Sequence, residues 1–398
     1  MGEWIKTLLM IVGSFFIQPL FIVGVIWSIG MSLKRIRTER KIYRVAIFKE
    51  WFEVKDFLVM GLLPGVIASI LLTVLGVPLT IEWIVFYQIS TLILLVLFGT
   101  RYIHPIITFP VTALLLSVTN WILETNSSSN LNIMGYSVEQ LNFFNNHLLV
   151  NGLVVMFLVL LVTIFSLSFY KMKHLSPDFL KTSRGKWVGS YFLKPFWVLP
   201  LLIIVPGNLF TAVFDWWPVF GIGNQTYTVL FLPILLGLQL KVQAQIPQQA
   251  LKLVVKDLMI LMGVLVVLIG INIVWSAFTW ISYLIMFIGA IAVYLRHRNR
   301  EHNWSFLYGS NDEGLKVLGI RPATPAAKMK LSVGDTIVTC NDVPIKTEDD
   351  FYQALKINSA YCHLKIKQID GEYRLEQTAI YEDSPHEIGV VTIPEKLV

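Results

Sequence analysis

The sequence is poor in charge and in cysteine, and each shortage excludes a class of protein. Only 15% of the 398 residues are charged and 55% are hydrophobic, whereas a soluble domain has about 25% charged residues. A soluble fold of this size cannot bury so much apolar side chain, so most of the chain is predicted to lie in a lipid bilayer. The two cysteines, Cys340 and Cys362, form no zinc-binding spacing and are expected to be buried thiols.

The short motifs of membrane-associated enzymes are also missing. An intramembrane zinc protease needs His-Glu-x-x-His on a helix, and a nucleotide-binding loop needs Gly-x-x-x-x-Gly-Lys; neither string occurs. A trypsin-like protease needs a separate soluble domain for its Ser, His and Asp, and the chain leaves no room for one. We therefore expect a protein with no enzymatic activity, no cofactor, no metal and no small-molecule substrate.

The net charge of +6 is the sum of a positive contribution from one part of the chain and a negative contribution from the other. Residues 1–300 carry an excess of 11 basic residues, and residues 301–398 carry an excess of 5 acidic residues. A nucleic-acid-binding protein concentrates its positive charge on one folded face, so this distribution argues against such a partner. It suggests instead basic loops on a membrane domain over residues 1–300 and a mildly acidic domain over residues 301–398.

The apolar residues fall into eight runs with almost no charge inside them. A membrane-spanning helix needs about 20 such residues. The eighth run is too long for one crossing, and Asn272 and Trp275-Ser276 suggest a turn within it. The fold class predicted is an all-α polytopic membrane domain of eight or nine transmembrane helices, followed by a small α+β domain. The runs are Leu8–Gly30, Phe57–Leu75, Trp83–Gly99, Ile103–Leu123, Leu148–Tyr170, Phe196–Phe214, Tyr227–Leu240 and Leu258–Leu295.

An internal repeat is one open reading of this pattern. Leu63-Pro64-Gly65 in the second run and Val205-Pro206-Gly207 in the sixth are each followed by a short uncharged loop and another run. The simpler reading is that proline and glycine are common in spanning helices.

Basic residues alternate from loop to loop, which predicts the orientation of the chain. Loops 31–56, 171–195 and 241–257 are basic, whereas loops 76–82, 124–147 and 215–226 carry no Lys or Arg. Because basic loops stay in the cytoplasm, the C-terminal domain is predicted to be cytoplasmic. The basic loops either bind anionic lipid or an acidic partner, or only set the topology. The candidate residues are Lys34, Arg35, Arg37, Arg40, Lys41, Lys181, Arg184 and Lys186.

The C-terminal domain resembles a bacterial PDZ domain. The resemblance rests on Val317–Lys328, on the Gly334-Asp335-x-Ile337 turn, on Asn341-Asp342 and on a helix expected over 348–357. It implies a groove that captures a partner strand. The segment 306–309 departs from the Gly-Leu-Gly-Phe-like loop of the family, so binding of a C-terminus or of an internal strand stays open. The predicted groove residues are Phe306, Leu307, Tyr308, Phe351, Ala354 and Leu355.

The whole chain, a multi-span region without catalytic motifs that ends in one PDZ-like domain, resembles the MinJ-type family of division-site topology proteins of rod-shaped Gram-positive bacteria. The resemblance implies a multi-pass cell-membrane scaffold at cell poles and division septa. It implies that the protein bridges a DivIVA-like protein to a MinD-like ATPase and, through MinC, prevents FtsZ assembly at wrong sites. Contacts with other divisome membrane proteins are also implied.

Two further functions compete with a division scaffold. A transporter with a regulatory PDZ domain would need polar groups along its path, and the spans hold few, among them Asn208 and Asn272. A neutral or lipid substrate would escape that argument. A regulator of a membrane protease would itself be inert, and its deletion would make a protease substrate accumulate.

Overall fold

The computed structural model describes residues 2–43, 46–125, 132–133, 136–137, 146–170, 172, 174–182, 185, 187–207, 219–222, 225–309, 313–358, 360–380 and 388–393. Six of its helical segments are long and apolar enough to cross a membrane, namely Pro19–Tyr43, Phe52–Leu75, Ile81–Tyr102, Leu149–Ser168, Pro247–Val274 and Ser276–Asn303. Two shorter apolar helices, Ile5–Ile17 and Pro105–Thr119, accompany them.

The helices are α1 Gly2–Ile17, α2 Pro19–Tyr43, α3 Phe52–Val59, α4 Leu62–Leu75, α5 Ile81–Phe98, η1 Gly99–Tyr102, α6 Pro105–Thr125, α7 Asn146–Ser168, α8 Pro247–Val274, η3 Ser276–Phe278, α9 Thr279–Asn303, η4 Pro325–Lys328 and α10 Glu348–Ile357. The strands are β1 Asn132–Ile133, β2 Tyr136–Ser137, β3 Pro177–Lys181, β4 Trp187–Leu193, β5 Phe196–Pro206, β6 Val219–Ile222, β7 Gln225–Gly237, β8 Leu240–Val242, β9 Leu315–Lys316, β10 Gly319–Ile320, β11 Thr336–Cys340, β12 Val343–Pro344, β13 Tyr361–Lys367, β14 Tyr373–Ala379 and β15 Val390–Val391.

The first and the eighth apolar runs each divide into two helices. The first is interrupted at Gln18, where Pro19 begins α2 because it needs no N–H partner at a helix start. The eighth turns at η3, as Trp275-Ser276 suggested. Asn272 stabilises that turn, since its side chain donates to Ser282 Oγ (2.7 Å) and accepts from Thr279 Oγ1 (2.8 Å).

The sixth and seventh runs are not helices, so the prediction of an all-α membrane domain was wrong. They form the antiparallel strands β5 and β7, which pair along their length with Pro200 opposite Pro233. Proline inside a helix removes a hydrogen bond and clashes with the preceding turn. In a sheet it is tolerated where its backbone points away from the partner strand. The two Pro-Gly segments therefore differ, one in a helix and one at a strand end, which argues against the repeat.

The antiparallel pair β5–β7 is called the hairpin below. Its edges are covered by groups that complete their backbone hydrogen bonds. On the β5 side, Leu202 N–H donates to Ser69 Oγ of α4 (2.8 Å) and Leu79 N–H donates to Ile204 O (2.9 Å). On the β7 side, Gln18 Nε2 donates to Phe231 O (2.6 Å), and β6 pairs with the outer part of the strand. A strand pair in an apolar environment needs such cover, because no water is available to its free edges.

The Ser69→Ala substitution tests this cover. It leaves the partly buried Leu202 N–H without an acceptor, and we expect a loss of about 1–3 kcal/mol in the free energy of unfolding. Thr73→Ala is the matched control, since the Thr73 hydroxyl donates to Ser69 O within α4 and does not contact the hairpin. Thermal melting in detergent measures both. Equal melting temperatures for the two variants would show that the edge does not depend on Ser69.

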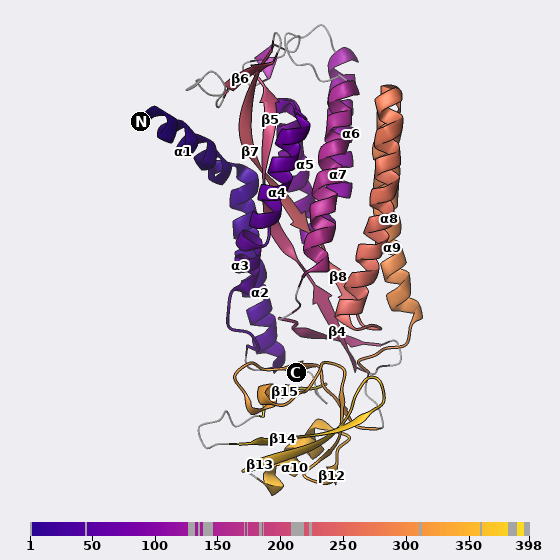
Figure 1. The fold of residues 1–398 in the computed structure, drawn as a ribbon. Helices are drawn as coiled ribbons and strands as arrows, with labels where there is room; N and C mark the ends of the chain where they lie inside the picture. The colour runs from indigo at the N-terminus through magenta and orange to yellow at the C-terminus, as the bar shows by residue number, and fades with distance from the viewer. Residues whose placement is uncertain are drawn as a thin grey trace.

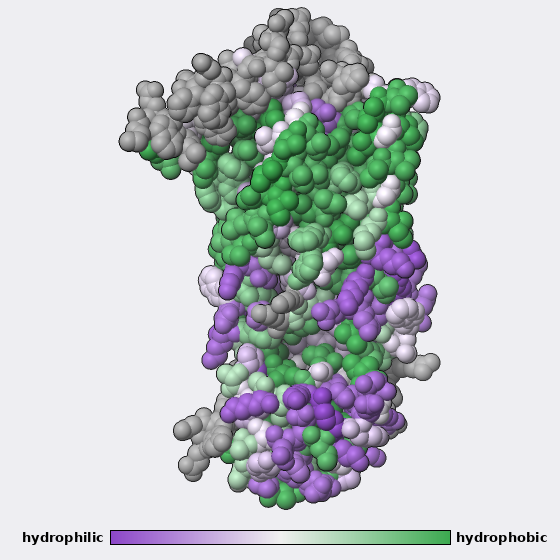
Figure 2. Space-filling view, viewed as in Figure 1, coloured by the Kyte–Doolittle hydropathy of each residue, from purple (hydrophilic) through white to green (hydrophobic). Residues whose placement is uncertain are grey.

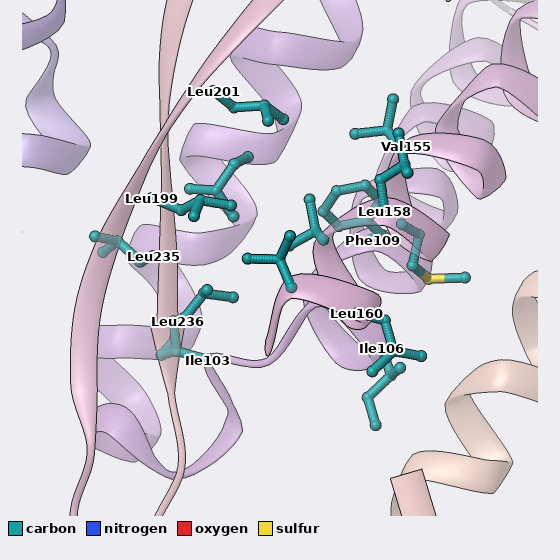
Figure 3. Close-up of a cluster of buried hydrophobic side chains, with 14 of the residues drawn as sticks. Ile103, Ile106, Phe109, Val155, Leu158, Leu160, Leu199, Leu201, Leu235 and Leu236 are labelled. Atoms are coloured by element: carbon teal, nitrogen blue, oxygen red, sulfur yellow. The ribbon is translucent and has the colours of Figure 1, made fainter. Parts of the chain in front are cut away.

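The hairpin packs into the main hydrophobic core (Figure 3). Leu199 and Leu201 of β5 and Leu236 of β7 lie on the face of the strand pair toward Phe109 of α6 and Leu158 of α7, which are also fully or nearly fully buried. At about 3.3 Å per residue, the 11 residues of β5 reach about 36 Å, which exceeds the roughly 30 Å of a bilayer's hydrocarbon core. The hairpin therefore runs beside the helices over a comparable length (Figure 1).

The described residues of the predicted basic loops lie at one end of the molecule, and those of the predicted uncharged loops lie at the other. At the basic end, Tyr43 OH at the end of α2 donates to Pro177 O, and His297 Nε2 of α9 lies 3.1 Å from Lys241 O. At the other end, Asn151 of α7 donates to Pro78 O, and Pro78 pairs with Ile204 of β5. β5 and β7 are antiparallel, so the pair starts and finishes at the same end of the molecule, as two successive helices would. Figure 2 shows hydrophilic side chains over the basic end and the C-terminal strands.

Candidate interaction surface

The C-terminal region, residues 304–393, holds a small antiparallel sheet with α10 packed on it. The sheet has the order β12-β11-β13-β14, with β9 beside β11, and β10 pairs separately with β15. The helix predicted over 348–357 is confirmed, Thr336–Cys340 forms the strand β11, and β13 and β14 form a hairpin through Asp370-Gly371. Cys340 and Cys362 are buried and free, as expected.

Local chemistry explains these elements. Thr347 Oγ1 accepts from Asp350 N–H (3.1 Å) and Asp350 Oδ2 accepts from Thr347 N–H (3.0 Å), a reciprocal pair that begins α10. The N–H groups of Lys346 and Thr347 lower the pKa of Asp350, because they stabilise its charged form. Asn341 and Asp342 have φ of 48° and 67°, as the tight turn between β11 and β12 requires.

The Gly334-Asp335 turn is also built around a buried group. Gly334 has φ of 99°, which a side chain would strain. The Asp335 carboxylate accepts from Ser332 N–H (2.9 Å), and burial raises its pKa while that N–H and the positive charges of Arg374 and Lys316 oppose the rise. Burial lowers the pKa of Lys316, whose Nζ donates to Gly334 O (3.2 Å). These contacts fix the turn on which the PDZ resemblance partly rests.

The structure divides the six predicted groove residues into two groups. Phe351 and Ala354 of α10 are buried in the core of the C-terminal region, and Leu355 packs partly buried against the same core. Leu307 and Tyr308 belong to a different cluster, and Phe306 is 47% exposed. Tyr308, Phe351 and Ala354 are 0%, 2% and 1% exposed, so their predicted placement in an open groove needs correction. The groove role of Phe306, Leu307 and Leu355 stays a prediction.

Tyr308 belongs to an interface that we call the seam, where the C-terminal region packs against the base of the membrane domain. Gly189 N–H of β4 donates to Tyr308 O (2.9 Å), and Tyr308 OH donates to Gln245 O (3.2 Å). Tyr191 OH donates in turn to Leu318 O, and its ring meets that of Tyr308 edge to face at 4.9 Å. Burial raises the pKa of both tyrosines, so they remain neutral. The buried residues of the seam are Ile47, Phe179, Tyr191, Tyr308, Leu318 and Val391.

Glu301, at the end of α9, holds the chain next to the seam. Its carboxylate is 5% exposed and accepts from Gln243 N–H (2.7 Å), Ala244 N–H (2.9 Å) and Gln245 Nε2 (2.6 Å). A buried carboxylate with three donors is satisfied and holds its partners in place. Sequence reasoning missed the seam and Glu301, and the aromatic-rich segment directly after the last span was the available signal.

Two edges of the C-terminal region differ in their exposure. β14 ends the sheet, and its Tyr373 and Leu375 are 59% and 70% exposed. The edge of β10 is covered by β15, since Leu318 N–H donates to Val391 O and Arg321 N–H donates to Gly389 O, both at 2.8 Å. Ile388–Ile393 therefore joins the region through the sheet of two strands that β15 forms with β10.

The predicted basic residues also separate into two kinds. Arg35 is enclosed: it pairs with Glu53 (2.6 Å) and Glu39 (3.1 Å), donates to Phe48 O, and lies 4.2 Å over the Phe52 ring. Arg35 therefore holds the loop after α2 and offers no charge to a ligand. Lys34, Arg37, Arg40, Lys41 and Lys181 are exposed, whereas Arg184 and Lys186 lie outside the described residues. Within the described ranges, no cluster of three or more His, Cys, Asp or Glu is placed to hold a metal ion.

No protein-family model matches the chain, and no solved structure is significantly similar to it. The cell division topological determinant MinJ of Bacillus subtilis (strain 168) is 28% identical over 397 residues, which cover 99% of this chain and 96% of that protein. Probable cell division topological determinants MinJ of Lacticaseibacillus paracasei and Lacticaseibacillus casei (strain BD-II) are each 40% identical over 85 residues, 21% of this chain and 23% of theirs. The resemblance predicted from the sequence is confirmed: the chain is similar from end to end to the MinJ type of cell-division topological determinant.

Proposed function

We propose that the protein is a non-enzymatic membrane scaffold that selects the division site, with its C-terminal region in the cytoplasm. The observation that carries the proposal is the similarity to a cell division topological determinant over 99% of the chain. The collection of exposed basic residues at the end that bears the C-terminal region supports the orientation, because such residues remain on the cytoplasmic side.

The proposed partners are a DivIVA-like protein at poles and septa and a MinD-like ATPase, with other divisome membrane proteins beside them. The partner contacts are proposed to lie on the cytoplasmic C-terminal region. A scaffold of this kind needs a rigidly held binding region, and the seam fixes the region against the membrane domain with buried aromatic side chains and hydrogen bonds. A groove bordered by α10 remains the proposed peptide site, with Leu355 as its partly exposed member.

A fluorescent fusion to the C-terminus tests the proposal in dividing cells. We expect bands at new septa, retention at poles, and filamentous or minicell-forming cells when the gene is deleted. Co-purification with DivIVA-like and MinD-like proteins of the same cell tests the bridge. Uniform membrane fluorescence with normal division would contradict the scaffold, and assays of transport and of protease substrates would then separate the two competing functions.

A further inference from the structure

A small cavity lies near the basic end of the membrane domain, between η1, α6, α8 and α9. Its volume is about 40 Å³, and because a water needs roughly 10–15 Å³ it has room for two or three hydroxyl-sized groups. Its walls are largely apolar side chains such as Ile106, Leu258 and Val293. Its polar lining comes from Arg101, His104 and His297 together with two tyrosines.

The two histidines present complementary nitrogens without partners. His104 Nδ1 accepts from Ile106 N–H at 3.4 Å, so the proton of the neutral ring is on Nε2. His297 Nε2 lies 3.1 Å from Lys241 O, which can only accept, so the proton of this ring is also on Nε2 and Nδ1 is left as an acceptor. His104 Nε2 and His297 Nδ1 are both buried and make no hydrogen bond within the described residues.

A hydroxyl carries both the acceptor and the donor that these two nitrogens need. A hydroxyl accepts a hydrogen bond from His104 Nε2–H and donates one to His297 Nδ1. A carboxylate or a phosphate oxygen could only accept, and an ammonium could only donate. Leaving both nitrogens unpaired in an apolar wall is costly, which favours an occupant that carries a hydroxyl.

Arg101 adds a positive charge to the same cavity. Its guanidinium lies 4.3 Å from the centre of the Tyr294 ring and 5.3 Å from that of Tyr102, and it makes no ion pair in the described part of the chain. Arg101 is partly exposed, at the end of the span Ile81–Tyr102. Along α9, the cavity residue His297 lies among Arg296, Arg298 and Arg300, which follow the apolar part of the helix. Such residues mark the level of lipid headgroups.

We propose that the cavity binds the headgroup of an anionic phospholipid that carries a free hydroxyl, with the phosphate against Arg101 and the hydroxyl between His104 and His297. Phosphatidylglycerol has this chemistry. The site is distinct from the exposed basic residues of the loops, because it recognises the hydroxyl as well as the charge of the headgroup. The inference does not depend on the proposed division function.

The test compares two lipids of equal charge on the purified full-length protein. Dioleoylphosphatidylglycerol and dioleoylphosphatidylmethanol share the phosphodiester, and only the first carries headgroup hydroxyls. We expect native mass spectrometry and thermal melting in mixed micelles to show about fivefold to tenfold tighter binding of phosphatidylglycerol, the contribution of one or two hydrogen bonds. Equal binding of the two lipids would overturn the site. Equivalent stabilisation by free glycerol 3-phosphate would instead identify a soluble phosphate as the ligand and would overturn the assignment to a lipid.

Variants distinguish binding in the cavity from a general attraction of anionic lipid to positive charge. His104→Phe should abolish the preference for phosphatidylglycerol, and His104→Gln should retain it because the amide N–H occupies the place of Nε2–H. Arg101→Gln should weaken binding of both lipids, whereas Arg298→Gln removes the same charge from an exposed position on α9 and should leave binding unchanged. Melting temperatures without lipid verify that each variant is folded. An unchanged lipid preference in a folded His104→Phe variant would contradict the proposal.

Discussion

The Gly61→Leu substitution is expected to prevent the membrane domain from folding around its hairpin. A Cβ at Gly61 would fall 1.8 Å from Val198 O and 2.7 Å from Val198 C of β5. These are backbone atoms of a paired strand, so they cannot move aside as the end of a flexible side chain does. Overpacking of a core costs about 1–3 kcal/mol when side chains can adjust. Here we expect a loss at or above the upper end of that range and little recoverable protein.

The measurement is the yield and the melting temperature of detergent-purified protein. Gly263→Leu is the matched control, because it places the same side chain in a membrane helix where nothing lies within 4 Å of the new Cβ. Gly65→Leu should behave like Gly61→Leu, since its Cβ would fall 2.7 Å from both Pro200 Cδ and Pro200 O. Normal yield and melting of the Gly61 variant would show that α4 does not pack on β5 as described.

The Tyr308→Ala substitution is expected to release the C-terminal region from the membrane domain without unfolding either. Tyr308 is fully buried in the seam, and truncation of a large buried aromatic side chain costs about 3–5 kcal/mol. The core of the C-terminal region is a separate cluster built around residues such as Ile337 and Leu364, so its own packing is not changed. The loss should therefore appear as undocking.

Hydrogen exchange detects undocking at the backbone groups that the seam covers. We expect faster exchange at Gly189 and Leu307, whose N–H groups bond across the seam, and unchanged exchange in β13. Tyr373→Ala is the matched control, because that ring is 59% exposed on β14. Slow exchange at Gly189 in the Tyr308 variant, or faster exchange throughout β13, would each contradict a separable seam.

The sequence was sufficient for the positions of the apolar segments and for the alternation of basic loops. It was misleading about β5 and β7, because a strand buried on both faces reads as a continuous apolar run, as a spanning helix does. The signal that separates them was present in Pro200 and Pro206 of the sixth run and in Pro233 of the seventh, because proline breaks the interior of a helix. The edge cover that lets strands exist there comes from Gln18, Ser69 and Leu79, which are distant in the sequence and invisible to local patterns.

In the candidate surface too, features set by neighbouring residues can be predicted from the sequence, and features set by distant residues cannot. The start of α10 at Thr347 and Asp350 and the turn at Asn341-Asp342 depend on neighbours in the chain, so they are accessible to sequence patterns. The burial of Tyr308 depends on Tyr191 and Gln245, which lie on the membrane domain. The aromatic residues directly after the last span signal that this ring is buried, but no pattern within the C-terminal region shows which surface covers it.

The pairing of Pro200 with Pro233 fixes the register between β5 and β7. Side chains alternate between the two faces of a strand, so a shift of one residue between β5 and β7 exchanges the faces of the whole strand. The same shift would turn one of the two prolines toward the ladder, where it would lack the N–H that the partner strand needs. A helix that gains one residue turns by about 100° and can repack. A paired strand cannot adjust by such a rotation, so we expect the hairpin to accept substitutions and to reject insertions and deletions.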